Sequence, residues 1–220
     1  MNWIPFLGSI LLGIITYKTR ILDISGSVGA ALISMIIWGL RGLGWIIPFI
    51  LFTTIGYSAT RWNYKIKRKE GIAEGRSGKR GIENVFGNGL APLLFAFIGN
   101  PLPFLGSIAT ALADSMASEI GVLSPKARSI ITFKEEVPGT DGAVSLLGTL
   151  AAAAGSLAIA SLGVLLLQLN LNNFFLVFIA GFLGCQIDSI LGATLERRGY
   201  LSKSHVNLLA TFSGGLITLL

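Results

Sequence analysis

The feature that most constrains this chain is a series of apolar runs, each about as long as a membrane is thick. They cover residues 3–17, 25–40, 43–60, 83–99, 104–122, 142–167, 174–193 and 205–220. A helix needs about 20 apolar residues to cross a bilayer, and each run is near that length or somewhat shorter. Charged residues are 13% of the chain, where soluble proteins average about 25%. The sequence therefore predicts an all-α, polytopic transmembrane bundle of about seven or eight helices, in one integral membrane domain over residues 1–220.

Basic residues are confined almost entirely to one set of loops between these runs. If eight helices alternate across the membrane, the loops after the first, third, fifth and seventh runs carry every lysine and arginine except Arg41. Cytoplasmic loops carry such an excess of positive charge. We therefore expect these loops to face the cytoplasm, with the active site among them. The short chain favours a prokaryotic plasma membrane.

The net charge of +6 is explained by this topology and by attraction to anionic lipid headgroups. The longest polar stretch, the basic loop 61–81, suits an amphipathic helix on the membrane surface. We therefore expect membrane lipids as partners and no nucleic acid. Whether the chain is a monomer or a homo-oligomer stays open from the sequence.

Carboxylates stand inside two of the apolar runs, where an ionised group is costly and marks a functional candidate. Asp114 and Glu119 lie in one run, and Asp188 and Glu196 lie at the end of another. On an ideal helix Asp114 and Glu119 are about 140° apart, so they bind one ion only if the helix breaks or another helix supplies ligands. With Asp188 opposite, these groups would form an oxygen-only site of the kind Mg²⁺ takes beside phosphates. Protonation or hydrogen bonding within the bundle is the alternative for each aspartate.

The loop 124–142 has the composition of a phosphate-binding turn. Pro138 and Gly139 interrupt regular structure, and we expect Thr140 or Asp141 to cap the helix that follows. The first N–H groups of a helix favour anions. The predicted phosphate-binding set is therefore Gly139, Thr140, Asp141 and Gly142, with Lys134 just upstream. Ordinary helix capping is the alternative.

A polar stripe lies at the start of the fourth long run. Arg80, Asn84 and Asn88 recur every four residues and share one helix face, which suits the wall of a polar cavity. Hydrogen bonding between helices is the alternative for the asparagines. Cys185 is expected to be core packing, and His205 has no partner that would indicate a zinc site.

Five segments together resemble a known family. They are Leu-Asp-x-Ser-Gly-Ser at 22–27, the stripe from Arg80 to Asn88, Ala-Asp-Ser-x-Ala-Ser-Glu-Ile-Gly at 113–121, Pro-Gly-Thr-Asp-Gly-Ala-Val-Ser at 138–145 and Asp-Ser-Ile-Leu-Gly-Ala-Thr-Leu at 188–195. Over nearly the whole chain this pattern resembles the integral membrane family that includes transmembrane protein 19 and the plant and cyanobacterial phytyl-phosphate kinases of vitamin E synthesis. Asn84 and Gly87 depart from it, standing where Gln and Ala are more usual.

The resemblance implies transfer of a phosphoryl group from a nucleoside triphosphate, CTP or another, to a phytyl or polyprenyl monophosphate. Such transfer depends on positioning and charge neutralisation, which Mg²⁺ and basic groups provide. The predicted catalytic and metal-binding residues are Asp114, Glu119 and Asp188. Phosphates would be held by Arg80, Lys134 and the turn from Gly139 to Gly142, with Asn84, Asn88, Ser118 and Glu196 in support.

Two other functions use the same features. A cytidylyltransferase would transfer the cytidylyl group of CTP to a lipid phosphate and release diphosphate, with the same metal and basic groups. A cation-coupled transporter would also place acids within the membrane. Because the acids and the polar loops concentrate toward one side of the membrane, the sequence favours the kinase.

Overall fold

The apolar runs of the sequence correspond one to one with long helices. The computed structural model describes residues 3–69 and 80–220, and in these ranges each predicted run forms a helix. They are α1 (Ile4–Lys18), α2 (Ile24–Arg41), α3 (Ile47–Arg61), α5 (Ile82–Ile98), α6 (Pro101–Gly121), α7 (Leu146–Leu167), α8 (Leu171–Leu191) and α9 (Lys203–Ile217). The prediction of an all-α bundle is confirmed.

Three shorter helical elements complete the described helices. A 3-10 turn, η1 (Leu43–Trp45), leads into α3, the short helix α4 (Tyr64–Lys69) follows it, and a π-helical turn, η3 (Gly192–Glu196), extends α8. Helix α4 lies within the basic loop 61–81, where the sequence predicts an amphipathic surface helix. Residues 70–79 of that loop lie outside the described ranges.

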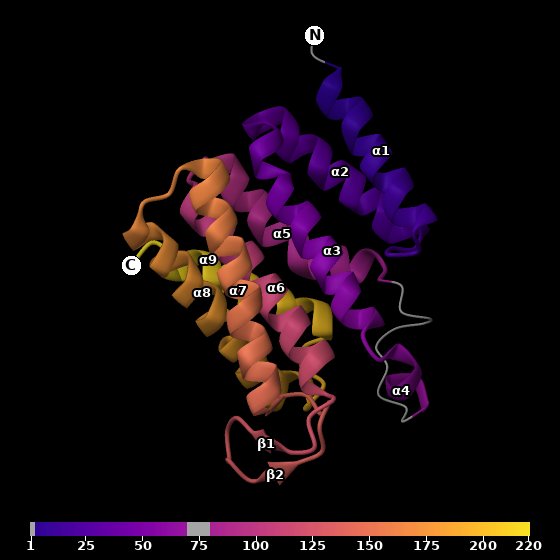
Figure 1. Ribbon diagram of the computed structural model, residues 1–220, viewed down its shortest axis with the longest axis vertical. Coiled ribbons are helices and arrows are strands. Elements are labelled where there is room, and N and C mark those ends of the chain that lie inside the picture. The colour runs from indigo at the N-terminus through magenta and orange to yellow at the C-terminus, as the bar shows by residue number, and fades with distance from the viewer. Residues whose placement is uncertain (1–2, 70–79) are drawn as a thin grey trace.

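Helix α6 is the centre of the bundle. Every residue from 103 to 115 is buried, and α6 packs against α3, α5, α7, α8 and α9 (Figure 1). Small residues allow this close packing: a Cβ on Gly106 would lie 2.6 Å from the carbonyl oxygen of Gly214 in α9. The α1–α2 pair joins the bundle through α2 and α5. Functional groups on α6 are therefore held by neighbours on several sides.

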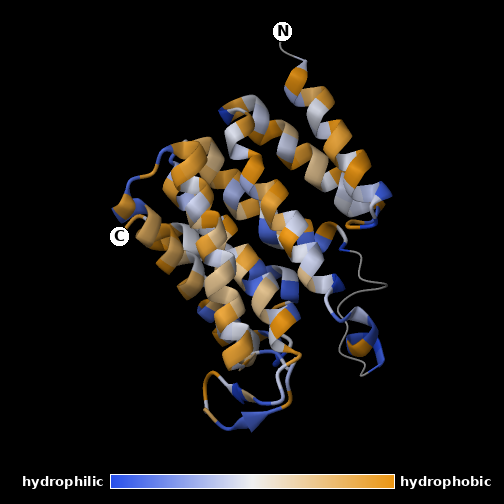
Figure 2. Ribbon diagram, in the orientation of Figure 1, coloured by the Kyte–Doolittle hydropathy of each residue, from blue (hydrophilic) through white to orange (hydrophobic). Residues whose placement is uncertain are grey.

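The outer surface of the bundle is apolar. Four of the described helical segments are long and apolar enough to cross a membrane, namely Ile24–Arg41, Leu43–Arg61, Leu146–Leu167 and Leu171–Glu196. Figure 2 shows apolar residues along the outside of the helices and hydrophilic residues gathered in the connections after α3 and α6. A water-soluble protein would not expose so many large apolar side chains together.

The loop before α7 is more ordered than the sequence indicated. It holds a small antiparallel sheet of order β2-β1-β3, formed by β1 (Ala127–Ser129), β2 (Glu135–Glu136) and β3 (Ala143–Val144). The prediction that Thr140 or Asp141 caps α7 was wrong, because β3 intervenes. Ser145 is the cap: its hydroxyl accepts from Gly148 N at 3.1 Å and donates to the Gly121 carbonyl at 3.1 Å.

Arg41, the one basic residue outside the predicted cytoplasmic loops, has a structural role. Its guanidinium donates to the carbonyl oxygens of Ala96 at 2.7 Å and Phe97 at 2.9 Å. These carbonyls belong to the last turn of α5, where no further N–H group of the helix is available to donate to them. Arg41 therefore satisfies the C-terminal end of α5.

Candidate active site

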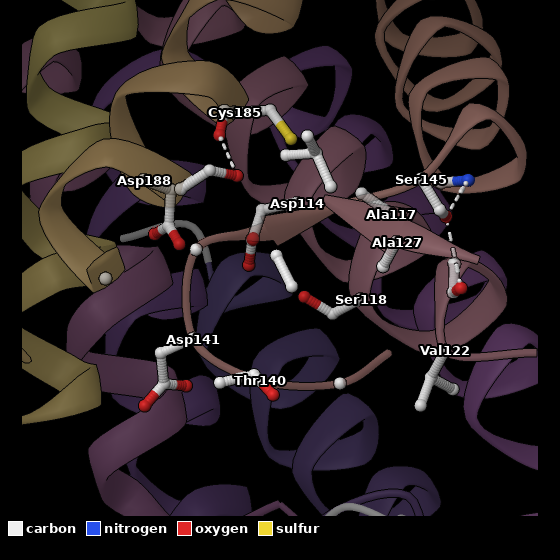
Figure 3. A pocket seen from close by; sticks show the side chains of 18 of the residues that line it. Asp114, Ala117, Ser118, Val122, Ala127, Thr140, Asp141, Ser145, Cys185 and Asp188 are labelled. Carbon is white, nitrogen blue, oxygen red and sulfur yellow. Dashed lines mark hydrogen bonds between the residues drawn. The ribbon is translucent and has the colours of Figure 1, made fainter. Parts of the chain in front are cut away.

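A cavity of about 250 Å³ lies where α6, α8 and α9 meet the loop before α7. Figure 3 shows side chains that line it. Helix α6 contributes Asp114, Ala117, Ser118 and Glu119; the turn from Pro138 to Ser145 closes a second side; and α8 with η3 contributes Cys185, Gln186, Asp188, Ser189, Gly192 and Glu196, with Lys203 from α9.

Two predicted catalytic aspartates lie together in this cavity. Asp114 of α6 is 9% exposed and Asp188 of α8 is 5% exposed. Both carboxyl groups line the same cavity and lie near one another (Figure 3). Two adjacent carboxylates repel each other unless positive charge or a proton offsets the repulsion. Lys203 supplies part of that positive charge, and the pair is also suited to bind a cation.

An asparagine from α9 supports Asp188. The amide of Asn207 satisfies its neighbours when Nδ2 donates to Asp188 Oδ2 at 3.2 Å and to the Lys203 carbonyl at 3.1 Å. In the same orientation its oxygen accepts from Asn88 Nδ2 at 3.3 Å. The predicted residue Asn88 thus reaches the acid pair through Asn207. Asn207 could have been noticed beforehand only as a polar residue in an apolar run.

Glu119, the third predicted metal ligand, has a different partner. Its Oε2 lies 2.5 Å from the ammonium nitrogen of Lys67, a side chain that is completely buried. The ammonium also donates to the carbonyl oxygens of Ala59 at 3.1 Å and of Glu119 itself at 3.3 Å. Glu119 still borders the cavity. The ion pair argues against direct metal binding by Glu119, which stays a prediction.

The turn that faces the acid pair depends on two glycines. Gly139 has φ of +87° and Gly142 has φ of +75°, values that other residues rarely adopt. A Cβ on Gly142 would also lie 2.7 Å from Cα of Ala193 in η3. Arg197, just after η3, pairs with Glu136 of β2 and ties the sheet to the end of α8. The turn is therefore held against α8 by backbone shape and by an ion pair.

The charged residues that line the cavity are mainly acidic. Besides the aspartate pair and the ion-paired Glu119, it includes Asp141 and Glu196, and Lys203 is the one basic residue among the described lining residues. Lys203 also lies close to Asp188. In the sequence, Lys203 indicated only the orientation of the helices, because basic residues are common at that side of a membrane helix. Of the predicted supporting residues, Ser118 and Glu196 line this cavity.

Four predicted phosphate-site or supporting residues lie outside the acid cavity. Lys134 is exposed, between β1 and β2, and does not line the described wall of the cavity. Arg80, Asn84 and Asn88 line a second, apolar cavity between α1, α2, α3 and α5. Arg80 also reaches α6, because its guanidinium lies 3.5 Å from the hydroxyl of Ser115, the neighbour of Asp114.

A family profile places the chain. The profile described as integral membrane protein DUF92 matches residues 7–215. The chain belongs to this integral membrane family. No solved structure matches it.

Curated relatives in the DUF92 family come from archaea, cyanobacteria and plants. An uncharacterized membrane protein of Methanocaldococcus jannaschii is 34% identical, with 96% of this chain and 90% of the relative aligned. One of Synechocystis is 36% identical, over 86% of this chain and 78% of the relative. The chloroplastic protein VTE6 of Arabidopsis thaliana is 30% identical, over 90% of this chain and 65% of the relative. These relatives cover nearly the whole bundle.

The arrangement restricts how this DUF92 protein could hold a metal. Among residues 3–69 and 80–220, no three His, Cys, Asp or Glu side chains are grouped closely enough to bind a metal by themselves. Asp114 and Asp188 are the carboxylates that could bind one together. A metal with two carboxylate ligands and room for water and phosphate oxygens matches the coordination habit of Mg²⁺ better than that of a fully caged ion.

Proposed function

We propose that the protein is a membrane-embedded kinase that transfers a phosphoryl group from a nucleoside triphosphate to an isoprenoid monophosphate. The observation that carries the proposal is the Asp114–Asp188 pair facing the glycine turn across one cavity. The resemblance of the sequence motifs to those of phytyl-phosphate kinases supports the substrate class. The coarser conclusion, membership of an integral membrane family, does not depend on this proposal.

The charge of the cavity supports a metal-dependent reaction. A triphosphate would be repelled by Asp114, Asp188, Asp141 and Glu196 unless cations neutralised them. When bound, Mg²⁺ would supply positive charge that neutralises the phosphates during transfer. Asp114 and Asp188 would hold it, and the hydrogen bond from Asn207 would fix the orientation of Asp188.

The glycine turn and Lys203 would position the donor phosphates. The N–H groups of Gly139, Asp141 and Gly142 meet no hydrogen-bond acceptor among the described residues, whereas those of Thr140 and Ala143 bond within the turn. Backbone N–H groups and an ammonium group are ordinary phosphate ligands. Lys203 would therefore bind phosphate in place of Lys134, the residue predicted from the sequence.

The proposed reaction needs no separate general base. An oxygen of the lipid monophosphate, already an anion, attacks the γ-phosphorus of the nucleotide. The bond from that phosphorus to the β–γ bridging oxygen breaks, and the products are an isoprenoid diphosphate and a nucleoside diphosphate. The task of the protein is alignment and charge neutralisation.

A product analysis tests this proposal. Purified protein in detergent is incubated with geranylgeranyl or phytyl monophosphate, Mg²⁺ and each of the four nucleoside triphosphates, and products are identified by mass spectrometry. We expect a prenyl diphosphate and a nucleoside diphosphate. A nucleotide-linked lipid with free diphosphate would instead show cytidylyl-type transfer. No product with any donor, from protein that is folded, would refute the enzyme and favour transport.

A further inference from the structure

The second cavity has apolar walls and one charged end. It measures about 150 Å³ and lies between the α1–α2 pair, α3 and α5. Leu12, Ile33, Phe49 and Phe52 are among its apolar lining residues. Ile15 and Ile50 also line it and are 45% and 39% exposed, so the cavity opens on the apolar outer surface.

Arg80 is the charged residue of this cavity. It is half-buried, and its guanidinium reaches Thr60 Oγ1 of α3 at 3.3 Å and Ser115 Oγ of α6 at 3.5 Å. These are long contacts to neutral hydroxyls, and a guanidinium has five N–H donors. Within residues 3–69 and 80–220 no carboxylate forms an ion pair with Arg80. The cavity therefore presents a positive charge that the described residues do not neutralise.

The backbone around Arg80 is built to hold it in place. Its N–H donates to the Ile21 carbonyl at 3.2 Å and its carbonyl accepts from Asp23 N at 3.0 Å. Asp23 caps α2 by accepting from Gly26 N at 2.8 Å, and a Cβ on Gly26 would lie 2.7 Å from the Arg80 carbonyl oxygen. The Leu-Asp-x-Ser-Gly-Ser segment at 22–27 thus fixes the position of Arg80. Neither the acid pair nor the glycine turn explains this segment.

We propose that this cavity binds the lipid acceptor, an isoprenoid monophosphate, with Arg80 on its phosphate and the apolar wall on the first part of its tail. The inference rests on the proposed function and adds where the acceptor lies. An apolar chain ending in a phosphomonoester matches both the walls and the unmatched charge. Arginine binds phosphate oxygens in pairs and keeps its charge in apolar surroundings.

The placement puts the acceptor phosphate next to α6, the helix that also lines the proposed donor site. Arg80 contacts Ser115, which directly follows Asp114 in the chain. Asn88 lines the lipid cavity and reaches Asp188 through Asn207. A phosphate at Arg80 would therefore lie beside the helix that carries one acid of the pair. The tail would enter between α1 and α3, past Ile15 and Ile50, from the membrane.

A binding experiment separates this inference from the kinase proposal. Radiolabelled geranylgeranyl monophosphate is bound to the protein in phosphatidylcholine nanodiscs without nucleotide or divalent metal. The variants are Arg80→Gln, which removes the charge, and Ser34→Leu, which fills the cavity where Ser34 lines it. Matched controls are Arg128→Gln on the exposed face of β1 and Ser161→Leu on α7, outside the described lining of both cavities.

We expect Arg80→Gln to weaken binding by about ten- to hundredfold, the value of hydrogen bonds to a charged group. Ser34→Leu should weaken it at least about tenfold, since added bulk in a filled cavity is not accommodated. The controls should bind like the wild type. Unlabelled geranylgeraniol should displace the labelled lipid equally well from the wild type and from Arg80→Gln when the labelled lipid is bound to the same extent, because the alcohol lacks the phosphate that Arg80 would contact.

Each other outcome overturns a stated part. If the wild type binds the lipid and both variants bind it equally well, the cavity is not the acceptor site, while the kinase proposal stands. If the folded wild type binds no prenyl monophosphate, both proposals fail. If dioleoyl phosphatidic acid binds as tightly, the isoprenoid assignment is wrong. Should Arg80→Gln fail to fold, as judged by gel filtration and melting, Ser34→Leu decides alone.

Discussion

The ammonium nitrogen of Lys67 lies 2.5 Å from Oε2 of Glu119, and both side chains are almost completely buried. The pair joins α4, within the basic loop 61–81, to the last turns of α6, where Glu119 is five residues from Asp114. Its geometry shows why a carboxylate in an apolar run is not by itself a metal ligand. A buried charge needs a partner, and here the partner is a lysine from a distant part of the chain.

Breaking the Lys67–Glu119 pair should destabilise the fold. Lys67→Met or Glu119→Gln alone leaves one group without its charged partner, and we expect a loss of about 3–5 kcal/mol where the remaining charge stays buried. Replacing both, as Lys67→Met with Glu119→Leu, should recover most of that loss. Thermal unfolding in one detergent measures all three. A double variant that loses as much as the two single variants added together would mean that the pair has no energetic coupling.

The acid pair predicts opposite effects on stability and activity. Asp114→Asn and Asp188→Asn each remove one of two adjacent carboxylates, so the melting temperature should not fall. Turnover of prenyl monophosphate should drop by more than about a hundredfold. Loss of a group that only orients a metal ligand costs up to about a hundredfold in activity, and loss of the metal ligand itself should cost more. The exposed Glu135→Gln in β2 is the control. Full activity in both aspartate variants would remove the metal site from the proposal.

Much of this architecture was predictable from the sequence, and the exceptions have physical causes. The lengths of the apolar runs predicted the long helices, and the cost of burying charge indicated Asp114 and Asp188 as functional candidates. The partner of Glu119 was not predictable, since Lys67 looks like any basic residue of a cytoplasmic loop. Strands of two or three residues, as in β2 and β3, carry no periodic signal. The position of Arg80 depends on backbone pairing with residues 21–23, which are distant in sequence.

Removal of divalent metal should stop turnover reversibly. With EDTA in excess the activity should vanish, and Mg²⁺ should restore it, whereas Ca²⁺ should restore it poorly because it prefers more ligands and longer distances. Mg²⁺ should also raise the melting temperature of the wild type and not that of an Asp114→Asn, Asp188→Asn double variant. Unchanged activity in EDTA would exclude the proposed role of the acid pair in metal binding.

Lys203 should act on donor binding more than on the fold. It is half-buried at the start of α9 and is the basic residue among the described lining of the acid cavity. Lys203→Met should raise the KM for the nucleotide about tenfold or more, as expected for loss of a charge-assisted hydrogen bond. The binding of prenyl monophosphate should not change. Lys134→Met, in the exposed hairpin, is the matched comparison, and an equal effect there would restore the original assignment of that residue.

A comparison of Gly142 with Gly199 separates the cost of backbone strain from the cost of close packing, because the two residues have nearly equal φ. Gly142 has φ of +75° and Gly199 has φ of +74°, but a Cβ on Gly142 would press on Ala193, whereas one on Gly199 meets nothing within 4 Å. Gly199→Ala should therefore lose about 1–2 kcal/mol, the strain of the left-handed conformation. Gly142→Ala should lose about 1–3 kcal/mol more from overpacking against η3. Because the turn would move away from the acid pair, Gly142→Ala should also lose turnover, and Gly199→Ala should keep it. Thermal unfolding and the kinase assay on both variants check this, and equal behaviour of the two would show that close packing against α8 does not matter.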